Sequence, residues 1–194
     1  KMTNLNRYIF RGWHSTILTP YYYGGVLLGD ADPDWQYYLI SLMKKQLDWI
    51  SQTGSRRLID ICGNDLEFLA PYYPEEMELF KTAAKDGRLE AVRGMYSAAY
   101  LPILSEESNI RQFTYGLNIF RKVLGADVVT FISPSDHFDF HPQLPQILNS
   151  LGYKHALMNN TYANGQLSKL RYDIIKWQGL DGSEIEALPQ YTSS

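Results

Sequence analysis

The chain has 194 residues, of which 45% are hydrophobic and 20% charged, a composition typical of one globular domain with a sizeable core. Its formal net charge is −3 and it carries no basic stripe, so we expect no nucleic-acid partner. No apolar run approaches the roughly 20 residues that a membrane helix needs, so we expect no membrane partner. No signal-peptide core is visible at the start. Cys62 alone cannot form an intrachain disulfide, and since a chain without disulfides fits either compartment, cytoplasm and periplasm are both open.

Strand-like and helical segments alternate along the chain. In chain order we predict a strand over 6–15, a helix over 32–53, a strand over 56–62, a helix over 74–87, a strand over 89–96, a helix over 106–125, a strand over 127–133, a helix over 144–152, a strand over 153–160 and a hairpin over 174–190. Asp34 is expected to cap the first helix and Gly54 to end it. The alternation predicts an α/β fold, with a parallel sheet covered by helices, in a single domain over residues 1–194.

Ligands of such folds bind outside the carboxyl ends of the strands. His14, Asp136 and the segment 93–100 all fall at predicted strand ends. We therefore expect the functional site at that edge of the sheet. Whether the protein forms a homo-oligomer is left open.

The stretch that follows the strand 127–133 is dense in acids and histidines. If it is extended, His137, Asp139 and His141 share one face and could ligate a divalent metal. Alternatively, Asp136 is presented into a cleft at the strand's carboxyl end, where a carboxylate can attack an anomeric carbon. A third reading makes Asp136 a cap of the turn or of the following helix.

Four segments between residues 65 and 183 resemble glycoside hydrolase family 38, the α-mannosidase catalytic domain, in order and in near-matching spacing. They are LEFLAPYYPEEMELFKTAAKDGRLEAVRGMY, SEESNIRQFTYGLNIFRKVLG, SDHFDFHPQLPQILNSLGY and IKWQGLDGSEI. The resemblance implies a carbohydrate substrate and the N-terminal part of a seven-stranded α/β barrel.

Carried over by position, the resemblance makes Asp136 the nucleophile and a zinc ligand, and His14 a second zinc ligand. It also makes Tyr96, Tyr100 and Phe138 substrate-binding residues. The general acid and the last zinc-binding histidine of the family fall beyond residue 194. Zinc is the one cofactor that the resemblance implies.

The chain departs from the family pattern at several site positions. Thr16 replaces an expected zinc-binding aspartate, Ala98 and Tyr100 replace an acidic pair, and Tyr96 replaces a tryptophan. We therefore carry three hypotheses. The first is an α-mannosidase-like glycoside hydrolase, the second a catalytically degenerate relative that binds carbohydrate or serves as a structural domain, and the third a metal-dependent deacetylase or other hydrolase that uses residues 137–141.

Overall fold

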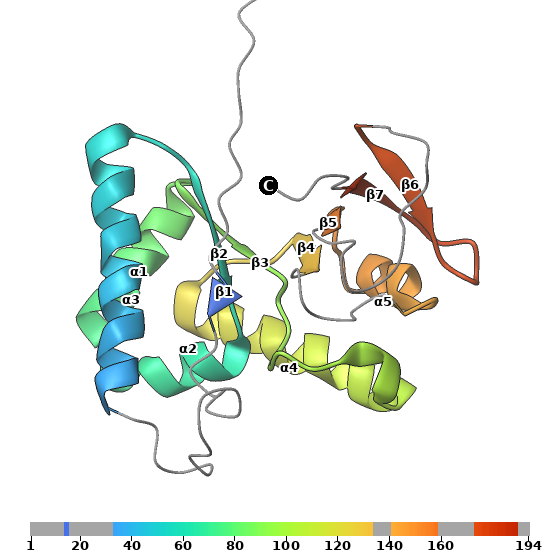
Figure 1. The fold of residues 1–194 in the computed structure, drawn as a ribbon, viewed down its shortest axis with the longest axis horizontal. Coiled ribbons are helices and arrows are strands. Elements are labelled where there is room, and N and C mark those ends of the chain that lie inside the picture. Colours follow the sequence, from blue (N-terminus) through green and yellow to red (C-terminus); the bar gives the residue numbers. More distant parts are fainter. Residues whose placement is uncertain (1–13, 16–32, 134–140, 159–172, 190–194) are drawn as a thin grey trace, which may run out of the picture.

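The computed structural model describes residues 14–15, 33–133, 141–158 and 173–189, which form one sheet packed against helices (Figure 1). In chain order the elements are β1 (His14–Ser15), α1 (Pro33–Thr53), β2 (Arg57–Ile61), α2 (Gly63–Leu69), α3 (Pro74–Lys85), β3 (Leu89–Val92), the 3-10 helix η2 (Leu101–Ile103), α4 (Glu106–Leu124), β4 (Thr130–Ser133), α5 (Leu144–Ser150), β5 (His155–Met158), β6 (Ile175–Gln178) and β7 (Glu184–Pro189). The predicted alternation of strands and helices is confirmed.

The sheet has seven strands in the order β1-β2-β3-β4-β5-β7-β6. All neighbours are parallel except β6 and β7, which form the predicted hairpin. The α/β class is therefore confirmed. Among the described strands β1 and β6 are the two edges of the sheet, so closure into a barrel stays a prediction.

Local sequence signals explain where the helices begin and end. The Ser105 hydroxyl accepts a hydrogen bond from the Ser108 amide and caps α4, whose first turn carries Glu106 and Glu107. Gly125 ends α4 in the left-handed conformation, with φ of 62°. Gly54 likewise follows α1 with φ of 63°, as predicted.

Two predictions about element boundaries are wrong, and one short helix was missed. Asp34 is not a cap, because α1 already begins at Pro33. The strand predicted over 89–96 ends at Val92, because Arg93 and Gly94 have φ values of 69° and 72° and turn the chain out of the extended conformation. The seven-residue helix α2 was not predicted, since it is too short to show helical periodicity.

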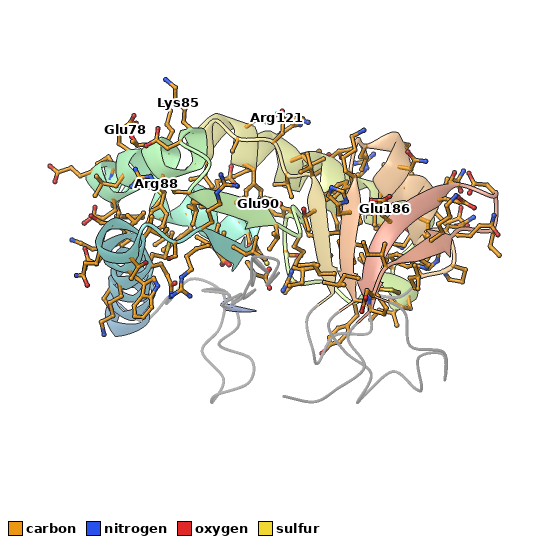
Figure 2. All side chains as sticks on the ribbon, turned by 90° about the horizontal axis from the view of Figure 1, so that it is seen from above. Glu78, Lys85, Arg88, Glu90, Arg121 and Glu186 are labelled. Atoms are coloured by element: carbon orange, nitrogen blue, oxygen red, sulfur yellow. The ribbon has the colours of Figure 1, made fainter. Side chains whose placement is uncertain are left out.

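The core lies between the sheet and its helices. Alternate strand residues such as Ile59, Ala91 and Phe131 are buried in it together with Phe113 and Phe120 of α4. Figure 2 shows α3, α4 and α5 along one side of the curved sheet. The strand residues between these buried positions point to the opposite face of the sheet.

That second face carries a pocket of about 260 Å³ near the amino ends of the strands. Its polar lining includes Glu90 of β3 and Glu186 of β7, both labelled in Figure 2. Thr130 donates a hydrogen bond to Glu90 at 2.6 Å, and His155 Nδ1 lies 3.7 Å from Glu186 Oε2. Thr130 and His155 are the first residues of their strands, so this pocket lies away from the carboxyl edge where we expect the site.

No helix in the described part of the chain is both long and apolar enough to cross a membrane.

Candidate active site

The carboxyl ends of β2 and β3 bring together three segments that are distant in sequence. They are the beginning of α2, the loop 93–97 that follows β3, and the middle of α4. The Gly63 amide donates to Met95 O at 2.9 Å, and the Asn64 amide donates to Tyr96 O at 2.8 Å. The loop that carries the predicted substrate-binding residue Tyr96 is therefore fixed to α2 by two backbone hydrogen bonds.

Helix α4 holds the same loop from its other side through Gln112. The Tyr96 amide donates to Gln112 O at 2.7 Å, and the Gln112 side-chain oxygen accepts from the Ser97 amide at 2.9 Å and the Ser97 hydroxyl at 3.0 Å. A buried loop needs partners for its polar backbone groups, and one glutamine provides three acceptor contacts here.

Glycine lets these segments approach closely. A Cβ at Gly116 of α4 would lie 2.5 Å from Met95 C and 2.6 Å from Tyr96 N, and a Cβ at Gly63 would lie 3.1 Å from Gly116 Cα. Since these neighbours are backbone atoms, Gly116 has no room for a side chain, and a side chain at Gly63 would require the backbone of α4 to shift by a few tenths of an ångström. The close approach sets the depth at which the loop sits against α4.

The side chain of Tyr96 is half-buried and its hydroxyl donates to Glu67 Oε2 at 3.0 Å. This hydrogen bond, together with partial burial, raises the pKa of Tyr96 above its ordinary value, so the phenol keeps its proton. The ring also meets the Tyr115 ring edge-on, with centroids 6.5 Å apart and planes at 81°. Tyr96 thus presents a fixed aromatic ring and a protonated hydroxyl at the site.

A buried ion pair joins the ends of β2 and β3. Arg93 Nη2 lies 2.7 Å from Asp60 Oδ2, and the two side chains are 1% and 4% exposed. The Tyr153 hydroxyl donates to Arg93 O at 2.9 Å, and burial raises the pKa of this tyrosine well above its ordinary value. Arg93 is also the one described non-glycine residue with positive φ.

Sequence reasoning placed Arg93 in the segment 93–100 at the candidate edge, but it predicted neither a role for Asp60 nor the ion pair. The signal was present, because Asp60 is the single charged residue in the apolar run 58–62. An acid within a buried strand is almost never fully buried unless it is paired, so a partner was to be expected. Buried charges and unusual backbone conformations both concentrate at functional sites.

The other predicted site residues are placed as follows. His14 in β1 stands in register with Asp60, at the same end of the sheet. Tyr100 is partly buried and precedes η2, four residues after Tyr96 in the same connection. Asp136 and Phe138 lie outside the described residues, so their roles stay predictions.

Of the two predicted zinc ligands, the structure describes His14 but not Asp136. Among these, no group of three or more His, Cys, Asp or Glu side chains could hold a metal ion. Asp60, in register with His14, already binds the guanidinium of Arg93, whose positive charge opposes a second cation nearby. The described residues alone therefore form no zinc site, and zinc binding by His14 together with Asp136, which lies outside them, stays a prediction.

An α/β sheet with a buried ion pair and an ordered aromatic loop at its carboxyl edge belongs to the class of folds that bind ligands there. Comparison with known proteins gives the family. The model of the glycosyl hydrolases family 38 N-terminal domain matches residues 41–193. The chain belongs to this family, as the four sequence segments predicted.

Individual relatives agree with this assignment. Alpha-mannosidase G of Dictyostelium discoideum is 32% identical over 113 residues, which are 58% of this chain and 10% of that protein. Alpha-mannosidase 2C1 of Mus musculus is 27% identical over 146 residues, 75% of this chain and 13% of that protein. The crystal structure of an alpha-mannosidase from Enterococcus faecalis V583 superposes with a TM-score of 0.61 at 25% identity, over 80% of this chain and 18% of that one. The chain thus spans a small part of each relative's length.

Proposed function

We propose that the chain belongs to an active glycoside hydrolase that cleaves an α-mannoside or a related glycoside with retention. The observation that carries this proposal is the family match over residues 41–193, a range that includes Asp136. The relatives named above are α-mannosidases, which supports an α-mannoside as the first substrate to test. The ordered loop around Tyr96 follows the carboxyl end of β3, and Asp136 follows the carboxyl end of the parallel neighbour β4 in the sequence. This supports a sugar-binding site at the carboxyl edge of the sheet.

In the proposed mechanism, the Asp136 carboxylate attacks the anomeric carbon of the sugar. A carbon–oxygen bond forms to Asp136 while the bond to the leaving group breaks, and a second carboxyl group gives its proton to the departing oxygen. Water then attacks the same carbon and the bond to Asp136 breaks. The second carboxylate takes the proton of that water, so both residues return to their starting states.

The described residues contribute binding and order to this scheme. Tyr96 offers a ring face for the apolar side of a sugar and a hydroxyl whose orientation Glu67 fixes. The buried pair of Asp60 and Arg93 fixes the ends of two strands, which keeps the edge rigid. A rigid edge lowers the entropy cost of positioning the sugar.

The test uses the complete protein with a panel of aryl glycosides that begins with 4-nitrophenyl α-mannoside. We expect turnover by the wild type, and a loss of at least about a thousandfold in kcat for Asp136→Asn with unchanged circular dichroism. Asp127→Asn is the matched control, because Asp127 lies at the surface in a pair with Arg121. Undiminished turnover by Asp136→Asn would overturn the assignment of the nucleophile.

A second candidate is a catalytically degenerate relative that binds carbohydrate. Replacement of the family's acids by Thr16, Ala98 and Tyr100 favours it, as does the guanidinium of Arg93 beside Asp60. This candidate predicts sugar binding without turnover on any glycoside of the panel.

Zinc is measured on the same sample by elemental analysis, and a stoichiometric content would support His14 and Asp136 as ligands.

A further inference from the structure

Four side chains form an aromatic and charged group on the surface where α2 meets α4. Glu67 comes from α2, Tyr96 from the loop after β3, and Arg111 and Tyr115 from α4; we name these residues the rim cluster. Figure 1 shows α2 and α4 next to each other at the end of the sheet to which β2 leads. The cluster therefore borders the edge at which the function proposed above requires the sugar to bind.

The two tyrosines of the rim cluster form a corner. Their rings meet at 81°, with centroids 6.5 Å apart, and Tyr115 is 51% exposed. A pyranose has one face of C–H groups that packs on an aromatic ring, while its hydroxyls point outward to polar partners. Two rings at nearly a right angle can contact such a sugar on its face and on its edge.

The charges of the rim cluster favour a neutral ligand. Arg111 Nε lies 2.7 Å from Glu107 Oε1, so the positive charge of Arg111 is balanced within its own helix. For Glu67, the described residues give a hydrogen bond from Tyr96 but no ion pair with a cation. The remaining negative charge repels carboxylated or phosphorylated sugars, and its oxygens can accept hydrogen bonds from sugar hydroxyls.

The cluster is ordered before any ligand binds. The Tyr96 backbone is held at both its amide and its carbonyl, by Gln112 O and the Asn64 amide, while its hydroxyl is held by Glu67. Arg111 Nη1 reaches Tyr115 Oη at 3.5 Å, which restrains the second ring. Little side-chain entropy is then lost when a sugar binds.

We propose that the rim cluster is a subsite for a second, neutral pyranose unit of the substrate, with Glu67 as its carboxylate and Tyr115 as its stacking ring. Glu67 supplies from α2 an acid of the kind that the chain lacks at Ala98 and Tyr100. This inference rests on the proposed function, because it places the second sugar next to the reacting one. It makes Glu67 and Tyr115 determinants of specificity for disaccharides over simple aryl glycosides.

The test measures binding of thio-linked α-mannobiose, which resists hydrolysis, to the complete protein by titration calorimetry. We expect Glu67→Gln and Tyr115→Ala each to weaken binding about tenfold, as loss of a hydrogen bond to a charged group or of a stacking ring does. Glutamine at position 67 still accepts the hydrogen bond from Tyr96, so the position of the loop is kept. Turnover of 4-nitrophenyl α-mannoside, which has one sugar, should stay within about twofold of wild type in Tyr115→Ala.

Matched controls come from the same kinds of side chain elsewhere on the surface. Tyr72 is 66% exposed, and Glu78 pairs with Lys81 on the surface of α3 and makes no contact with the rim cluster among the interactions of the described residues, so Tyr72→Ala and Glu78→Gln should bind the disaccharide as the wild type does. Wild-type affinity in both rim variants, or no binding of the disaccharide by the wild type, overturns the subsite. The proposed function fails separately, through the absence of turnover on aryl glycosides.

Discussion

Arg93 and Asp60 form an ion pair with an Nη2–Oδ2 distance of 2.7 Å, and both side chains are almost completely buried. The pair joins two neighbouring parallel strands at their carboxyl ends, where Asp60 stands in register with both Val92 and His14. A charge taken out of water is stable only beside an opposite charge or other strong polar partners. The two residues therefore depend on each other, and the shape of the proposed active edge depends on both.

Breaking this pair should destabilise the protein strongly. Arg93→Met leaves the Asp60 carboxylate buried without its guanidinium, and we expect the free energy of unfolding to fall by about 3–5 kcal/mol. Methionine, like arginine, has a Cβ, so the strain of the positive φ at this position is unchanged. Unfolding in guanidinium chloride measures the change.

An exposed ion pair provides the control for that substitution. Arg88 Nη2 lies 2.8 Å from Asp86 Oδ2, but these side chains are 40% and 49% exposed. Arg88→Met should therefore cost at most about 1 kcal/mol. Equal costs for the two substitutions would contradict the view that burial makes the pair of Arg93 and Asp60 important.

The close approach of α4 to the loop 93–97 gives a second prediction. Gly116→Ala places a Cβ against the backbone of Met95 and Tyr96, where no flexible side chain can give way. We expect a loss of about 1–3 kcal/mol in the free energy of unfolding, although alanine is the better helix former. Asn118→Ala, at an exposed position of the same helix, should instead be neutral or stabilising by up to about 0.7 kcal/mol.

Much of the fold could be predicted from the sequence, because the patterns that indicate helices, strands and turns are local. Apolar spacing marked the helices, and Gly54 and Gly125 marked two helix ends, since both adopt a left-handed conformation there. The short β-branched and apolar runs marked the buried strands. The hairpin over 174–190 was found from its turn residues, and Ser183 and Asp181 indeed hydrogen-bond within that turn.

The candidate site was harder to predict, because its contacts join residues that are distant in the sequence. Asp60 and Arg93 are separated by 33 positions, and Tyr96 and Glu67 by 29. No local sequence pattern shows that an acid in β2 pairs with an arginine that follows β3. Family resemblance indicated roles for Tyr96 and Asp136 by position. It assigned none to Glu67, although the first matching segment contains this residue, and helix α2 that carries it was not predicted.

Gln112 should control the order of the loop through a single side-chain oxygen. In Gln112→Ala the Ser97 amide loses its acceptor, and we expect its hydrogen exchange to become about three- to tenfold faster. The Tyr96 amide donates to the backbone oxygen of residue 112, so its protection should persist and serves as the internal control. Gln112→Glu keeps an accepting oxygen and should restore slow exchange at Ser97. Equal exchange at Ser97 in all three proteins would show that the loop is held without this side chain.

Tyr153 should give the protein a characteristic loss of stability in alkaline solution. Its side chain is 2% exposed, and burial raises the pKa of its phenol above the ordinary value of 10.0. Above about pH 10 the unfolded chain therefore releases this proton while the folded chain keeps it, so the free energy of unfolding falls as the pH rises. In Tyr153→Phe this contribution is absent, and the slope should be shallower by up to about 1.4 kcal/mol per pH unit.

The same substitution also removes the hydrogen bond from Tyr153 to Arg93 O, so the variant should be less stable by about 1 kcal/mol at neutral pH. The two stability curves should therefore approach each other as the pH rises above 10. Denaturant unfolding between pH 7 and 11 measures both effects, with Tyr72→Phe, at an exposed position, as the control. Parallel curves for wild type and Tyr153→Phe would mean that this phenol ionises as readily in the folded chain as in the unfolded one. The tyrosine could then not be the buried support of the Arg93 backbone that the structure describes.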